Sequence, residues 1–92
     1  GSYGTDRFVH NVRIYIDKYG LPDDASTLLI MLDAKDSDIV LKILTRIEEV
    51  YGTFSTRQKE DIGRKISILK MADKSLKIRE KAEVVLNAVG QR

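Results

Sequence analysis

The sequence has no cysteine, no tryptophan, one proline and one histidine. Without cysteine the chain can form no disulfide, no thiolate site for zinc or an iron–sulfur cluster, and no cysteine nucleophile. This composition is typical of a reducing compartment, so we expect a cytoplasmic protein. No apolar run approaches the roughly 20 residues that a membrane-spanning helix needs, and we expect no membrane partner.

What the chain does contain is typical of one small globular domain. Its 92 residues are 42% hydrophobic and 33% charged, which excludes disordered and collagen-like chains. Gly1-Ser2 resembles a remnant of cloning, and no initiator methionine precedes Tyr3. We therefore expect residues 3–92 to form a single helical domain taken from a longer protein.

Five segments have the apolar spacing of amphipathic helices, and none has the alternation of a strand. Gly20 is expected to end the first in a left-handed cap, and Ser55 with Gln58 has the spacing of a capping box. Gly63 allows either a close helix crossing or a kink, or it is an exposed neutral position in a helix stabilised by packing. The spacing predicts helices at 5–19, 23–34, 38–51, 56–72 and 76–89. One core is expected to contain Val12, Leu29, Ile43, Ile47, Ile62, Ile66, Ala82 and Leu86.

An internal repeat relates the third and fifth segments. Apolar residues of the third recur 39 residues later in the fifth, close to the period of arrays built from helix pairs. Tyr19-Gly20 also recurs as Tyr51-Gly52, and each pair precedes a new capped segment. The paired positions are Ile39 with Ile78, Ile43 with Ala82, Ile47 with Leu86, and Val50 with Val89.

The segment 73–86 resembles the second half of a HEAT repeat. The resemblance rests on an aspartate in the turn, an apolar-arginine pair, a small residue and a leucine, which here are Asp73, Ile78, Arg79, Ala82 and Leu86. It implies an all-α fold in which five helices stack as antiparallel hairpins, forming a fragment of a HEAT-like or armadillo-like right-handed α-solenoid. It also implies a non-catalytic scaffold that binds another protein.

The sequence offers no convergent catalytic constellation, so we expect neither an enzyme nor a cofactor. His10 lies opposite the apolar stripe of its helix and is predicted to be solvated. Asp33, Asp36 and Asp38 lack the glycine and glutamate of an EF-hand loop, and they are predicted to cap helices rather than bind a metal.

Two groups of residues are candidates for binding a partner. Apolar side chains away from the main stripes could form a docking surface, although burial between stacked helices would also explain them. The charge is uneven, with −3 over residues 1–55 and +5 over 56–92. The basic half could bind nucleic acid or another acidic ligand, or its charge could simply be dispersed for solubility. The docking candidates are Ile14, Leu41, Val84 and Ala88, and the anion-binding candidates are Arg64, Lys70, Lys74, Lys77 and Lys81.

Overall fold

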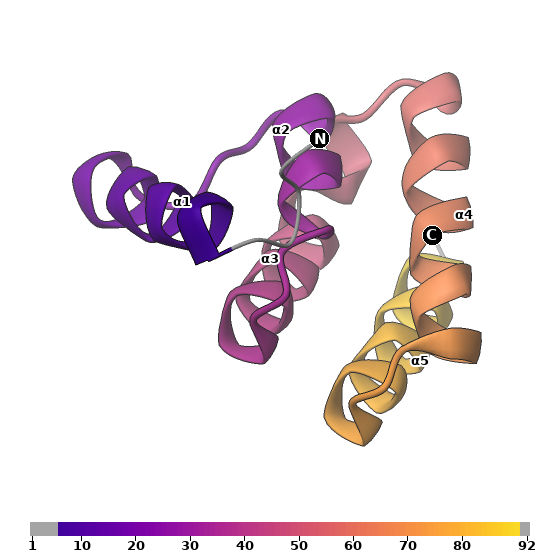
Figure 1. Cartoon of the computed structure of the whole chain (residues 1–92). Helices are drawn as coiled ribbons and strands as arrows, with labels where there is room; N and C mark the ends of the chain where they lie inside the picture. The colour runs from indigo at the N-terminus through magenta and orange to yellow at the C-terminus, as the bar shows by residue number, and fades with distance from the viewer. Residues whose placement is uncertain (1–5, 91–92) are drawn as a thin grey trace.

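The computed structural model describes residues 6–90 and is all-helical over that range (Figure 1). It contains α1 (Asp6–Tyr19), α2 (Ala25–Met31), α3 (Ser37–Val50), the short 3₁₀ helix η1 (Tyr51–Thr53), α4 (Thr56–Ala72) and α5 (Leu76–Gly90). The prediction of five α-helices without strands is therefore confirmed for the described residues. The largest difference is that α2 stops three residues before its predicted end.

The helix boundaries follow from local capping chemistry. Gly20 has a φ of +78°, and its N–H donates to the carbonyl of Ile16 at 2.8 Å, so it ends α1 as expected. Asp24 caps α2, with its carboxylate accepting the N–H of Thr27. The predicted capping box is also confirmed, because Ser55 and Gln58 each accept the other's backbone N–H. Thr5, the first residue of the predicted helix 5–19, lies outside the described residues.

The core is one cluster of buried apolar side chains drawn from all five α-helices and their connections. Six of the eight predicted core residues are buried: Val12, Ile43, Ile47, Ile62, Ile66 and Ala82. Leu29 and Leu86 are half-buried and pack against the edge of this cluster. Both leucines pack against the core, as their positions on the helical wheel predicted, but part of each side chain remains exposed to solvent.

The helices make an unequal set of contacts. The α2 and α5 helices each pack against both α3 and α4, whereas direct contact between α3 and α4 is slight. In Figure 1, α1 lies at one end of the molecule and the α4–α5 pair at the other, with α2 and α3 between them. The core therefore depends on α2 and α5 to connect its two halves.

Gly63 lies inside α4, and a Cβ placed on it would meet nothing within 4 Å. The possibility of a close helix crossing at this glycine is thereby excluded. Gly63 is half-buried, so it is also less exposed than the other alternative expected.

Candidate functional site

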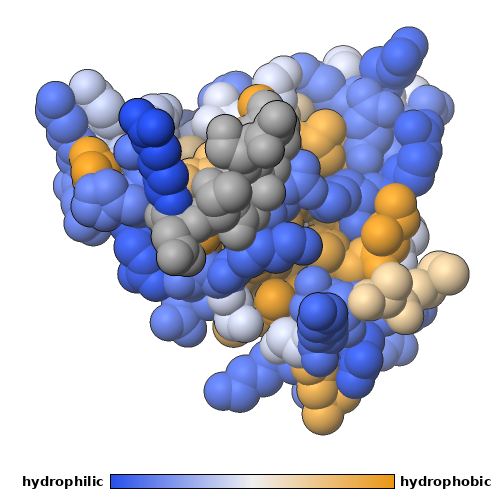
Figure 2. Space-filling model, viewed as in Figure 1, coloured by the Kyte–Doolittle hydropathy of each residue, from blue (hydrophilic) through white to orange (hydrophobic). Residues whose placement is uncertain are grey.

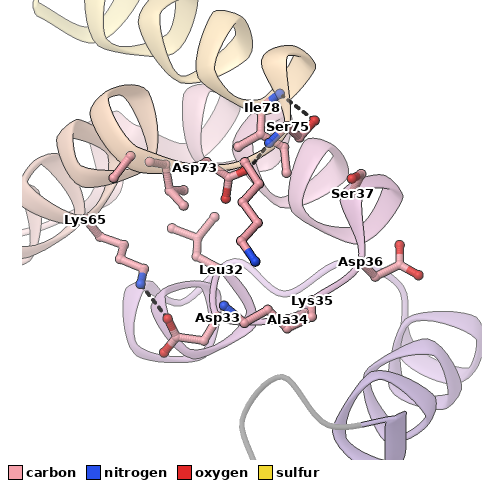
Figure 3. A pocket seen from close by; sticks show the side chains of 13 residues that line it. Leu32, Asp33, Ala34, Lys35, Asp36, Ser37, Lys65, Asp73, Ser75 and Ile78 are labelled. Carbon is pink, nitrogen blue, oxygen red and sulfur yellow. Dashed lines mark hydrogen bonds and ion pairs between the residues drawn. The ribbon is translucent and has the colours of Figure 1, made fainter.

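A pocket of about 390 Å³ lies where the start of α3 meets the start of α5 (Figure 3). Its walls come from the α2–α3 connection, one side of α4, the α4–α5 turn and the first turn of α5. Asp36 caps α3 through the N–H of Ile39, and Ser75 accepts the N–H of Ile78 at the start of α5. Because both caps line one pocket, the two helices begin at the same end of the molecule.

The carboxylates of this pocket are already engaged. Asp33 forms an ion pair with Lys65 at 2.5 Å, Asp36 pairs with Arg13, and Asp73 accepts the N–H of Ser75 at 2.8 Å. Figure 3 shows the Lys65 side chain reaching Asp33 across the pocket. Within residues 6–90 no cluster of three or more carboxylate and histidine side chains could hold a metal ion.

The pKa of two capping carboxylates lies below its ordinary value. For Asp36, desolvation raises the pKa, but the N–H groups of Ile39 and Asp38 together with the hydrogen bond and the charge of Arg13 outweigh it and lower the pKa. For Asp24, the hydroxyl and N–H of Thr27 both stabilise the charged form and lower its pKa. These shifts are typical of N-caps and indicate a structural role for both groups.

The lysines of the pocket divide into paired and unpaired groups. Lys65 is held by Asp33, whereas Lys35 and Lys74 form no ion pair with any residue in the described part of the chain.

The predicted capping role is confirmed for Asp36, while Asp33 is an ion-pair partner instead. His10 is exposed, as predicted.

The four docking candidates lie on three helices. Ile14 on α1 is 49% exposed and Val84 on α5 is 55% exposed, whereas Leu41 on α3 and Ala88 on α5 are half-buried. Val84 therefore is not covered within the domain. Leu41 packs against the core, so part of its apolar surface has the ordinary structural role that the sequence also allowed.

The five predicted anion-binding residues do not share one face. Arg64 is 160° around α4 from the buried Ile66 and pairs with Asp61 at 3.7 Å, so it points away from the core that α5 helps to form. Lys77 and Lys81 lie on α5, and Lys70 and Lys74 lie at the α4–α5 turn. Lys77 and Lys81 are one turn apart on α5, and Arg64 is separate from all four lysines.

Several exposed apolar side chains were missed by the sequence analysis. Met71 is 80% exposed and Ile68 is 53% exposed on α4, and Leu76 at the start of α5 is 59% exposed. Their angular positions carried the signal, since Ile68 lies about 160° from Ile66 around the helix axis. Figure 2 shows such apolar atoms reaching the surface on the side of the molecule where α4 lies.

Comparisons of the chain with protein-family models, with curated proteins and with solved structures find no match. No helix in residues 6–90 is long and apolar enough to cross a membrane.

Proposed function

We propose that this protein is a non-catalytic scaffold module, built as a HEAT-like right-handed stack of antiparallel helix hairpins, that binds another protein. The observation that carries the proposal is the selective packing of the helices. The same proposal places the protein in the cytoplasm, and this part of it rests on the absence of cysteine.

The contacts between helices follow the pattern of a two-layer stack. In such a stack each hairpin packs internally, its first helix packs on the next first helix, and its second on the next second helix. Here α2 contacts α3 and α4 contacts α5 within hairpins, while α2 contacts α4 and α3 contacts α5 between them. In such a stack, the second helix of one hairpin lies diagonally opposite the first helix of the next, and the two make little contact. The slight contact between α3 and α4 fits this diagonal position. The ion pair of Arg13 with Asp36 holds α1 near the start of α3, although α1 makes at most slight contact with each of the other helices; one layer would then be α1, α3 and α5.

The 39-residue repeat supports the same arrangement. Ile39 and Ile43 of α3 are buried, and so are their counterparts Ile78 and Ala82 of α5, whereas each of the other two pairs has one buried and one half-buried member. Two helices that use equivalent positions for the core are expected to occupy equivalent places in a stack.

The residues that resemble a HEAT repeat also contact one another. The Arg79 guanidinium donates to the backbone carbonyl of Asp73 at 3.1 Å, and the Asp73 carboxylate accepts the N–H of Ser75. Together they fix the α4–α5 turn. Ala82 is fully buried, as a small residue at a close helix contact should be.

The partner would bind the outer face of the layer formed by α1, α3 and α5. Ile14, Leu41 and Val84 come one from each of these helices, and Ala88 follows Val84 by one turn of α5. Exposed apolar side chains framed by charged ones are typical of protein interfaces. The charged frame on α5 includes Lys77, Glu80 and Lys81.

Site-specific photo-crosslinking in the source cell tests this function. A benzophenone amino acid at position 84 or 14 should crosslink the same protein, while the probe at exposed Glu60 on α4 should not. Val84→Glu should abolish recovery of that protein, and Thr56→Glu, at an exposed position on α4, should retain it. Identical crosslinking from position 60, or no partner common to positions 84 and 14, would refute the proposal.

Binding of nucleic acid by the basic half is the second candidate. The observation in its favour is that Lys70, Lys74 and Lys77 form no ion pair with any other described residue. Affinity for duplex DNA should then fall by about 0.9 log units per log unit of salt for each phosphate contacted. No binding at low salt, or equal binding by the Lys74→Glu/Lys77→Glu variant, would exclude it.

A further inference from the structure

The α4–α5 corner, defined here as residues 68–77, exposes three large apolar side chains within ten consecutive residues. Met71 is the most exposed large apolar residue of the described chain, and Ile68 and Leu76 are each more than half exposed. Ile68 and Met71 are three residues apart on α4 and therefore share a face of the helix. Leu76 follows the three-residue turn and begins α5. Side chains of this size usually find a partner when they are clustered at a surface.

The same corner has a surplus of positive charge. Lys70, Lys74 and Lys77 are exposed and form no ion pair with any residue from 6 to 90. The only carboxylate of the corner is Asp73, which is occupied by the N–H of Ser75. Asp73 forms no ion pair with these ammonium groups, in contrast to Asp33, which holds Lys65, so the corner keeps a net positive charge.

We propose that the α4–α5 corner binds an acidic amphipathic segment of another protein, which rests on the proposed function of a protein-binding scaffold. Apolar side chains of the segment cover Ile68, Met71 and Leu76, and its carboxylates meet the three lysines. Charge complementarity selects an acidic partner, and it also accelerates association. Met71 suits this role because its flexible thioether adapts to differently shaped partners.

A protein segment fits the corner better than nucleic acid does. A duplex backbone would meet the lysines but would leave the exposed Ile68 and Met71 against phosphates, with no gain from burying them. A helical segment with apolar residues at i, i+3 or i+4 and i+7 presents one apolar stripe flanked by acids. That stripe suits the exposed apolar face of α4, and its flanking acids suit Lys74 in the turn and Lys77 on α5.

The probe is a fluorescein-labelled synthetic peptide of about 16 residues, with leucines at i, i+3, i+4 and i+7 positions and glutamates at most others. Its binding to the whole protein is measured by fluorescence anisotropy at about 0.1 M salt. Two matched probes have the same composition in scrambled order, or lysine in place of each glutamate. A labelled duplex DNA is titrated in parallel.

We expect the acidic amphipathic peptide to bind at least tenfold more tightly than the scrambled and basic peptides and the DNA. Met71→Glu should weaken binding at least tenfold, and Lys74→Glu/Lys77→Glu should weaken it and reduce its dependence on salt. Both variants change exposed side chains, and circular dichroism with urea unfolding checks that they remain folded. Amide chemical-shift changes should centre on residues 68–77.

Val84→Glu is the variant that separates this inference from the proposed function, because Val84 is comparably exposed but lies on the outer face of α5. It should leave peptide binding unchanged. If Val84→Glu abolishes peptide binding while Met71→Glu retains it, the corner is not the site, although protein binding by the outer face stands. No binding of the peptide, equal binding of the scrambled peptide, or tighter binding of DNA overturns the inference. The crosslinking experiment at positions 84 and 14 is independent of all these outcomes.

Discussion

Ile43 lies at the centre of the packing that joins the two ends of the molecule, and its replacement should be costly. Its side chain has no solvent exposure, and α3, which carries it, packs against both α2 and α5. Ile43→Ala removes about three methylene equivalents, worth about 2.4 kcal/mol of transfer free energy. The cavity left in a rigid core adds to this value, so we expect a total loss of about 3–4 kcal/mol.

Urea unfolding followed by circular dichroism measures the loss directly, with an unchanged m-value expected for both proteins. The midpoint of thermal unfolding should fall by at least about 12 °C for a domain of this size. Ile14→Ala is the matched control, since Ile14 is half exposed, and it should cost less than about 1 kcal/mol. If the two variants lose the same stability, or Ile43→Ala loses under about 1 kcal/mol, the proposed packing around α3 is wrong.

Three further predictions follow from particular residues. Gly63→Ala should stabilise the protein by about 0.5–1 kcal/mol in urea unfolding, because the added Cβ meets nothing; a loss of stability would contradict the open space around Gly63. Leu86→Ala should cost about 1–2 kcal/mol, less than a fully buried leucine, since Leu86 is half-buried; a loss of about 4 kcal/mol would show deeper burial. The pKa of Asp36 is lowered on folding, so its stabilising effect is present above about pH 4 and is lost as the pH falls through the folded-state pKa. Asp36→Asn should therefore show a smaller loss of unfolding free energy between neutral and acid pH than the original protein, and equal losses would contradict the shift.

Much of the fold could be predicted because the signals for it are local. The helix ends could be predicted from Gly20 and from the Ser55–Gln58 pair, and the helices themselves from the apolar spacing. Each of these signals acts within about one helical turn, so the neighbouring helices need not be known. The surfaces were harder to predict, because exposure depends on which helices pack together. Leu41 and Val84 both lie off their main apolar stripes, yet only Leu41 packs against the core.

The candidate sites show the same division between local and distant causes. The capping role of Asp36 follows from its place before α3, and it was predicted. The ion pair of Asp33 with Lys65 joins residues 32 positions apart, which no local pattern could reveal. Likewise, the separation of Arg64 from the lysines at the α4–α5 turn depends on how the two helices pack.

At two positions that are buried on α3, the residues 39 positions later on α5 differ in burial and charge. Val40 and Leu44 are buried on α3, but their counterparts 39 residues later are Arg79, which is half-buried, and Glu83, which is exposed. Burying an arginine or a glutamate is costly unless it is paired, and Arg79 donates a hydrogen bond to the carbonyl of Asp73. The same repeat therefore places a valine and a leucine where a neighbouring helix covers them, and charged residues where α5 meets solvent.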